Sequence, residues 1–179
     1  TAPKDREIIA EVKAVTDFHT VKTMDKQEAL DKGLLTIIGA EIDDAYMEEL
    51  KKQIIHPEII KEQSENIKIV YTPFHGTGLV PVKRVLSELG FKNVYIVPEQ
   101  ELPDPEFTTL EYPNPEAKEA FALALKLAKE VDADLVLATD PDADRLGCYA
   151  KDSKTGEYKV FTGNMSGSLL CEYEVSQMK

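Results

Sequence analysis

The chain has 179 residues, of which 42% are hydrophobic and 30% are charged, and its formal net charge is −12. This length and composition are typical of a globular chain that buries one core, as one domain or one domain with parts of its neighbours. The acidic balance disfavours nucleic acid and anionic membrane as partners, because affinity for both comes largely from Lys and Arg. It does not exclude a phosphorylated small molecule, since a bound cation reverses the local field.

The two cysteines, Cys148 and Cys171, are too far apart in the sequence for a Cys-x-x-Cys site. With no disulfide framework indicated, we expect a reducing, cytoplasmic environment. No apolar run reaches the roughly 18 residues that span a bilayer. The chain begins at Thr1 with neither a Met nor a signal-peptide pattern, so we expect that it was cut from a longer polypeptide.

The first third of the chain is strongly charged, and we expect two helices there. A second helix is expected to open at Asp43 and Asp44, and the short run 34–38 is interpreted as an edge strand. Because apolar stripes at helical spacing usually face a core, both helices are expected to serve in packing and connection. The first stripe consists of Ile8, Ile9, Val12 and Val15, and the second of Tyr46, Met47, Leu50 and Ile54.

From Asn66 onward, apolar runs alternate with helical patterns. The expected order is a strand at 67–71, a helix ending at Gly90, a strand at 94–97, a helix opened by Asn114 and Pro115, and a strand at 133–139. Such an order indicates right-handed crossovers. We therefore predict an α/β fold, a three-layer βαβαβ domain with a mostly parallel sheet, flanked by partial neighbouring domains. Ligands bind at the carboxyl ends of such strands, an edge shared by the loops 74–78, 98–107 and 140–145.

Three carboxylates follow the last of these strands at alternate positions: Asp140, Asp142 and Asp144. Alternate side chains of an extended chain point to one side, so a slight curl makes them converge. Their mutual repulsion calls for a hard divalent cation, and Mg²⁺, with oxygens at roughly 2.1 Å, suits a site that also takes water or a phosphate oxygen. Arg145 adds a fork that binds phosphate. The other interpretation is an exposed acidic turn.

Other acidic motifs fit this loop less well. A calcium EF-hand loop needs Gly and Glu where Arg145 and Lys151 stand. A phosphatase of the haloacid dehalogenase type would use Asp140 as nucleophile and Asp142 as general acid, but too little chain follows for its downstream Lys and second acidic pair. That phosphatase is the enzyme alternative, and a non-catalytic module that binds metal or phosphate is the other.

The segment Phe74–Gly78 joins a strand to a helix and contains two glycines. Glycines permit a tight turn and close backbone approach, and a helix N-terminus favours an anion, so His75 and Gly76 are candidate substrate-binding residues. The segment lacks the Lys-Ser or Lys-Thr of a Walker A loop, and Pro81 replaces the third Gly of a dinucleotide fingerprint. The structural interpretation is a glycine turn that packs the helix on the sheet.

Residues 72–78 (TPFHGTG) and 139–147 (TDPDADRLG) together resemble the α-D-phosphohexomutase family, and most closely the four-domain phosphoglucomutase/phosphomannomutase type. The resemblance implies that residues 1–63 are the end of a first domain and a connecting helix. It makes residues 64–160 the metal-binding middle domain and residues 161–179 the start of a third.

The resemblance also implies a reaction: a phosphoserine interconverts hexose 1-phosphate and hexose 6-phosphate through a hexose 1,6-bisphosphate. Mg²⁺ would lie on Asp140, Asp142, Asp144 and an oxygen of the phosphoserine, and Arg145 would contact the phosphoryl group. The family's Ser-His-Asn-Pro loop and its sugar-reading and phosphate-holding loops do not occur in this sequence. We therefore expect this chain to be inactive without the missing domains of the same polypeptide.

Overall fold

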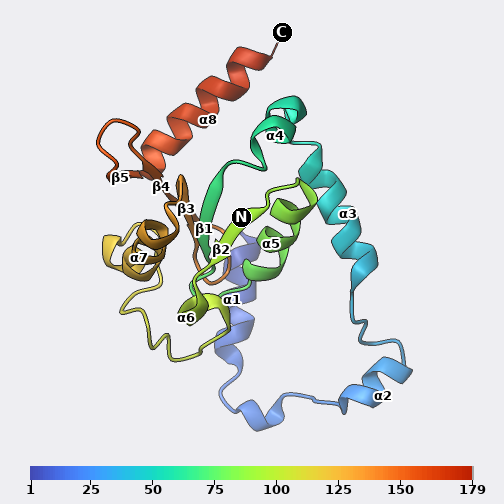
Figure 1. The fold of residues 1–179 in the computed structure, drawn as a ribbon. Coiled ribbons are helices and arrows are strands. Elements are labelled where there is room, and N and C mark those ends of the chain that lie inside the picture. Colours follow the sequence, from blue (N-terminus) through green and yellow to red (C-terminus); the bar gives the residue numbers. More distant parts are fainter. Residues whose placement is uncertain (179) are drawn as a thin grey trace. The chain divides into compact units, whose positions relative to one another are not determined.

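The computed structural model describes residues 1–178 (Figure 1). The chain divides into two compact units, Thr1–Asp43 and Asp44–Lys179. Among the helices of residues 1–178, none combines the length and the apolar character that a membrane crossing requires.

The first unit contains two short helices and a 3₁₀ turn. Helix α1 spans Lys4–Ala14, η1 spans Phe18–Thr20 and α2 spans Lys26–Asp31. Asp25 caps α2, because its carboxylate accepts from the backbone N–H groups of Gln27 and Glu28.

Two expectations for this unit are wrong. Residues 34–38 form no strand, since every strand within residues 1–178 lies between Lys68 and Phe161 and none pairs with this run. The apolar stripe of α1 does not pack against a core as expected, because Ile8 and Val12 are 61% and 62% exposed.

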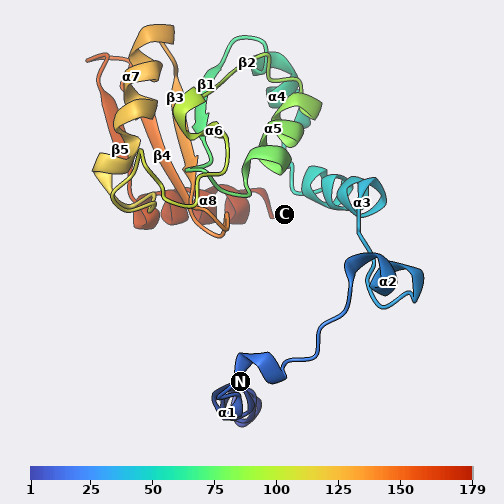
Figure 2. The same ribbon diagram turned by 90° about the horizontal axis from the view of Figure 1, so that it is seen from below.

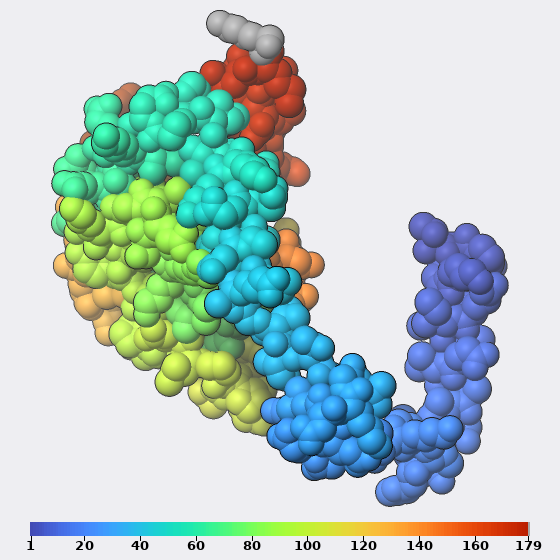
Figure 3. Space-filling model, turned by 90° about the vertical axis from the view of Figure 1, so that its right-hand side faces the viewer, coloured from blue at the N-terminus to red at the C-terminus, as the bar shows by residue number. Residues whose placement is uncertain are grey.

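The second unit begins with the end of α3 (Ala40–Lys51) and with α4 (Pro57–Gln63). Met47 is the buried residue of α3. Two ion pairs join α3 to α5 (Leu79–Glu88): Lys51 Nζ lies 2.7 Å from Glu88 Oε2, and Arg84 Nη2 lies 2.5 Å from Asp44 Oδ1. In the space-filling view α4 and α5 form neighbouring parts of one surface (Figure 3).

A five-stranded sheet in the order β2-β1-β3-β4-β5 forms the centre of the second unit. β1 is parallel to both β2 and β3, whereas β3–β4 and β4–β5 are antiparallel, so the sheet is mixed. The strands span Lys68–Thr72, Asn93–Ile96, Leu135–Thr139, Leu146–Lys151 and Tyr158–Phe161, from β1 to β5.

The two crossover helices, α5 and α7 (Ala122–Val131), lie on opposite faces of the sheet (Figures 1 and 2). This follows from the strand order: the chain moves outward from β1 to β2 and then back across β1 to β3, so right-handed crossovers fall on opposite sides. The predicted three-layer α/β domain is confirmed, but its sheet is mixed rather than mostly parallel, because two of the four strand pairings are antiparallel. The remaining helices are α6 (Pro98–Glu101), η2 (Lys118–Phe121) and α8 (Gly163–Gln177).

The core lies between the sheet and α7. Phe121 is fully buried, with its ring 5.7 Å from that of Phe74 and 4.7 Å from that of Tyr149. Burying a side chain of this size stabilises the fold by about 1.5–3 kcal/mol. Because Phe74 lies two residues after the end of β1, this cluster also anchors the start of the loop after that strand.

Two features after β2 differ from the sequence prediction. Asn114 does not cap a helix: its side chain accepts from the N–H of Glu116, a 3₁₀ turn starts at Lys118, and α7 starts only at Ala122. The antiparallel strands β4 and β5 were not predicted, because glycine, cysteine and lysine interrupt the apolar pattern of β4.

Candidate metal site and the loops that support it

The site lies where β1 and β3 end side by side. Thr72 pairs with Ala138 in the parallel register, so both strands finish at the same edge of the sheet. We call residues 74–78, after β1, the glycine loop and residues 140–145, between β3 and β4, the aspartate loop. The predicted position of both loops at one edge is confirmed.

Asp140 anchors the aspartate loop. Its side chain is fully buried, and it accepts from the Arg145 backbone N–H (3.0 Å) and from Arg145 Nε (2.6 Å). Burial by itself would raise the pKa of Asp140, but these hydrogen bonds and the Arg145 charge lower it below its ordinary value. Asp140 is therefore ionised at neutral pH, and it closes the loop onto β4.

Asp142 and Asp144 are exposed, yet their carboxylates converge with that of Asp140. One oxygen from each of the three lies within 4.8 Å of the others. The pKa of Asp144 is raised above its ordinary value, and the negative charge of Asp142 is the largest single cause, followed by the neighbouring Asp140. The three groups therefore repel one another in the absence of a cation, which is the electrostatic condition that favours binding one.

The donor set fits a hard divalent cation. Two oxygens bound to Mg²⁺ at roughly 2.1 Å lie roughly 3.0 Å apart when cis and 4.2 Å apart when trans, so oxygens within 4.8 Å of one another reach such positions by closing in by at most about 2 Å. Because Asp142 and Asp144 are exposed, water or a phosphate oxygen has access to the remaining coordination positions. The residues present are therefore compatible with Mg²⁺.

Arg145 lies beside this cluster and uses only part of its guanidinium group to hold Asp140. Its Nε is bonded to Asp140, its side chain is 47% exposed, and within residues 1–178 its two terminal nitrogens make no hydrogen bond. A cavity of about 380 Å³, whose lining includes Arg145, Lys118 and Thr162, lies against it. The lining also includes Glu116, so two cations and one carboxylate leave a net positive charge at the cavity, which favours an anionic ligand.

The backbone of the aspartate loop is held in an unusual conformation. Ala143 has φ of 59°, and its N–H donates to the carbonyl oxygen of Asp140 at 3.0 Å. A non-glycine residue in this region costs of the order of 1–3 kcal/mol and persists only where its surroundings enforce it. Nothing in the sequence Asp-Ala-Asp signals this strain.

His75 is buried rather than open to a ligand. Its Nδ1 lies 2.8 Å from the carbonyl oxygen of Leu102 and its Nε2 lies 2.8 Å from Thr109 Oγ1. A carbonyl only accepts, so Nδ1 carries a proton and donates to Leu102. His75 thus ties the glycine loop to the segment after β2, and the structure does not bring its ring nitrogens to the aspartate cluster.

The glycine loop contacts the aspartate loop directly. Thr77 donates to the carbonyl oxygen of Pro141 from its backbone N–H (2.8 Å) and from Oγ1 (3.1 Å). Gly76 lies against the backbone of the same proline. Beneath them, Tyr71 Oη and Thr139 Oγ1 are hydrogen-bonded at 2.8 Å in the interior.

These features coincide with a known family. The sequence model described as phosphoglucomutase/phosphomannomutase, alpha/beta/alpha domain II, matches residues 44–156. The chain belongs to this family, and the recognition from residues 72–78 and 139–147 is confirmed.

Individual relatives share a smaller part of their length with this chain. A phosphoribomutase of Saccharomyces cerevisiae is 39% identical over 85% of this chain and 25% of its own length. The human glucose 1,6-bisphosphate synthase is 46% identical over 69% of this chain and 20% of its own. The chain therefore spans about a quarter or less of these curated relatives.

A solved structure supports the fold. The crystal structure of a protein described as a phosphomannomutase from Thermus thermophilus superposes with a TM-score of 0.59 at 23% identity, covering 76% of this chain and 29% of the other. At this identity the likeness shows the fold alone.

Proposed function

We propose that this chain is the metal-binding portion of a sugar-phosphate mutase, which moves a phosphoryl group between two hydroxyls of one sugar through a phosphoserine and a sugar bisphosphate. The observation that carries the proposal is the convergence of Asp140, Asp142 and Asp144 at a strand end within a family domain. The chain alone is expected to be inactive, because the nucleophilic serine loop is not in its sequence.

In this proposal the three carboxylates hold Mg²⁺, which neutralises charge on the phosphoryl group as it transfers. Arg145 keeps Asp140 ionised through Nε and presents its terminal nitrogens to a phosphoryl oxygen. Phosphoryl transfer depends mainly on alignment and charge neutralisation, so these residues supply what the middle domain needs to contribute.

The phosphatase alternative is less compatible with the geometry. A nucleophilic aspartate must present a carboxylate oxygen to a phosphorus atom, but Asp140 is fully buried and both of its oxygens accept hydrogen bonds from Arg145. Each carboxylate oxygen keeps a further lone pair that a small cation can use, so Asp140 is better suited to fixing the loop and holding a cation than to covalent catalysis.

Two substrate classes remain within the proposal. The relatives include a phosphoribomutase and a glucose 1,6-bisphosphate synthase, and these names refer to a pentose and a hexose. A cavity of about 380 Å³ beside Arg145 is within the range for small ligands and has room for either sugar phosphate. We propose a hexose phosphate as the main substrate, with a pentose phosphate as the second candidate.

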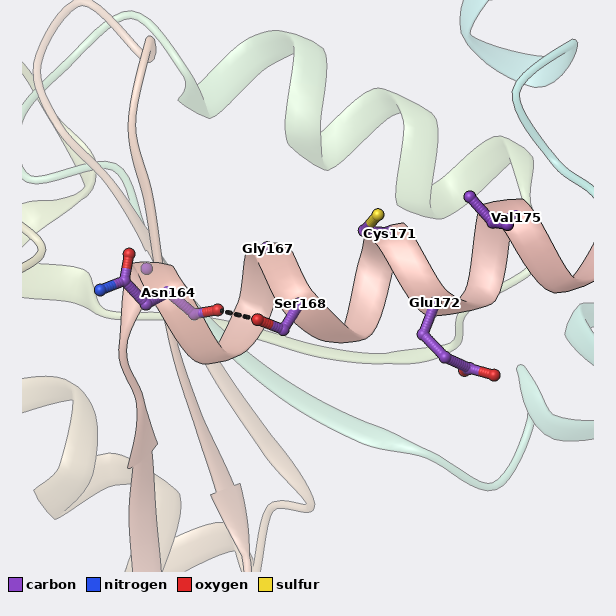
Figure 4. A pocket seen from close by; sticks show the side chains of 7 residues that line it. Asn164, Gly167, Ser168, Cys171, Glu172 and Val175 are labelled. Carbon is purple, nitrogen blue, oxygen red and sulfur yellow. Dashed lines mark hydrogen bonds between the residues drawn. The ribbon is translucent and has the colours of Figure 1, made fainter.

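The terminal segments are proposed to belong to neighbouring domains, with boundaries near residues 63 and 161. Their exposed apolar side chains support this: Leu170 and Val175 of α8 are 62% and 61% exposed. Figure 4 shows Gly167, Cys171 and Val175 along one side of α8, where small side chains leave room for an approaching partner. In a longer polypeptide, amide hydrogen exchange at residues 169–175 should be slower than in this chain.

The function is tested with the longer polypeptide beside the 179-residue chain. We expect the longer protein to convert glucose 1-phosphate to glucose 6-phosphate when primed with glucose 1,6-bisphosphate, to lose this activity in EDTA and to regain it with Mg²⁺. Ribose 1-phosphate tests the pentose alternative, and the 179-residue chain should convert neither. Turnover that EDTA does not affect, or release of inorganic phosphate without isomerisation, would contradict the proposal.

A further inference from the structure

Gly76 lies closer to the aspartate loop than any side chain permits. A Cβ atom added at Gly76 would lie 2.4 Å from Pro141 Cα and 2.5 Å from its carbonyl oxygen. Both are backbone atoms, so the clash cannot be relieved by turning a side chain. Substituting Gly76 must therefore move the backbone of the aspartate loop or of the glycine loop itself.

The contact extends along the aspartate loop. Thr77 holds the Pro141 carbonyl oxygen with two hydrogen bonds. A Cβ at Gly78 would lie 2.5 Å from Thr139 Oγ1 and 3.3 Å from the Cβ of Ala143. The glycine loop thus touches Thr139, Pro141 and Ala143.

Thr139, Pro141 and Ala143 alternate in sequence with the three acidic residues. A support at these intervening positions constrains the backbone on both sides of each carboxylate without covering the carboxylates. It also provides surroundings that can enforce the strained conformation of Ala143.

We propose that the glycine loop positions the aspartate loop for metal binding, so that Gly76 and Thr77 are positioning residues of the metal site. This inference rests on the proposed metal site. In this proposal Gly76 contacts the backbone of Pro141 in the aspartate loop, whereas the sequence suggested that Gly76 contacts the substrate. Neither residue touches the metal in this role; both act through the Pro141 peptide.

The test compares Mn²⁺ affinity of the 179-residue chain and its variants by electron paramagnetic resonance. Gly76→Ala should weaken binding at least about tenfold, because it displaces backbone. Thr77→Val should weaken it about threefold to tenfold, as expected for one lost hydrogen bond, and Thr77→Ser, which keeps Oγ, should bind as the parent does. Gly167→Ala, where an added Cβ meets nothing within 4 Å, is the matched control and should not change affinity.

A second readout requires no metal. Hydrogen exchange of the Asp140, Ala143 and Arg145 amides, which are bonded within the aspartate loop, should be faster in Thr77→Val than in Thr77→Ser. If Gly76→Ala does not fold, the comparison of Thr77→Val with Thr77→Ser tests the positioning role by itself.

The outcomes separate this inference from the proposed function. Unchanged Mn²⁺ affinity and unchanged exchange in Thr77→Val and in a folded Gly76→Ala would overturn the positioning role while leaving the metal site in place. A parent chain that binds no Mn²⁺ would remove the metal site, and with it the claim that the support serves metal binding, although the exchange comparison would still report the support itself.

Discussion

Asp140 and its two acidic neighbours in the aspartate loop meet very different surroundings. Asp140 is enclosed and hydrogen-bonded to Arg145, whereas Asp142 and Asp144 face solvent, and Asp144 Oδ1 lies 3.6 Å from Arg145 Nε. A buried carboxylate that loses its charge leaves its donors without an equivalent acceptor, but an exposed one is replaced by water. The first residue therefore contributes to stability, and the other two contribute mainly to the charge of the cluster.

Asp140→Asn should lower the free energy of unfolding by about 1–3 kcal/mol, because its amide cannot accept from both the Arg145 N–H and Arg145 Nε. Urea denaturation at pH 7, where the lowered pKa of Asp140 keeps it charged, measures this loss. Asp142→Asn is the matched control and should change stability little without metal, because it removes repulsion at an exposed position. Equal stability of the two variants would contradict the assigned role of Asp140.

Replacing glycine by alanine is expected to have opposite effects on stability at the end of α5 and inside α8. Gly90, which follows α5, has φ of +88°, whereas Gly167 lies inside α8 with open space around it. Gly90→Ala should lower the free energy of unfolding by about 1–2 kcal/mol, because L-residues are strained at positive φ. Gly167→Ala should raise the stability of α8 by about 0.5–1 kcal/mol, because alanine favours helix.

Thermal denaturation monitored by circular dichroism compares the two glycine variants with the parent. A Gly90→Ala protein as stable as the parent would show that the end of α5 does not need a left-handed residue. A destabilised Gly167→Ala would indicate that α8 has a close neighbour at that position.

The hairpin formed by β4 and β5 makes a pH-dependent contribution to the stability of the fold. The Lys159 ammonium, together with the backbone N–H groups of Lys154 and Thr155, lowers the pKa of Asp152 to about 2. A carboxyl group with a lowered pKa stabilises the fold above its unfolded value of about 3.9, and this contribution is lost as pH falls towards 2. Asp152→Asn should therefore be less stable than the parent at pH 6.

The measurement for the hairpin is the melting temperature of both proteins between pH 6 and pH 2. The difference between them should be constant above about pH 5 and should shrink below pH 4. A difference that does not change with pH would show that Asp152 acts through packing alone.

The parallel half of the sheet could be predicted from sequence, and the antiparallel half could not. β1 and β3 are apolar runs closed by Thr72 and Thr139, and Gly90 marks the end of the helix between β1 and β2. β4 pairs with the preceding strand β3 across the aspartate loop, but its composition, which includes Gly147 and Lys151, does not indicate a strand. The run 34–38 shows the converse, since β-branched residues form no strand without a partner.

At the scale of the whole molecule, the candidate site combines local and long-range information. The three aspartates converge because of their spacing along one loop, so sequence predicted them. Their support comes from Gly76 and Thr77, more than sixty positions earlier, which the sheet brings beside Pro141. His75 also belongs to this long-range class: its partners Leu102 and Thr109 could be identified only in the structure.

In the proposed function the metal binds to the middle domain, and the nucleophile lies elsewhere in a longer polypeptide. The family match covers residues 44–156, and the aspartate cluster lies inside it. A cation site held by one loop of one domain is expected to form without the rest of the enzyme, although more weakly than with a phosphoserine oxygen as a further ligand.

Paramagnetic broadening of amide signals by Mn²⁺ tests the metal site most directly, because it locates the ion as well as detecting it. In the ¹⁵N-labelled 179-residue chain, substoichiometric Mn²⁺ should first broaden the amide signals of Asp140, of residues 142–145 and of residues 76–78, and excess Mg²⁺ should restore them. The same signals should stay sharp in Asp142→Asn at the same Mn²⁺ concentration. Broadening centred on another acidic segment, or unchanged broadening in Asp142→Asn, would contradict the assignment of Asp140, Asp142 and Asp144 as the metal site.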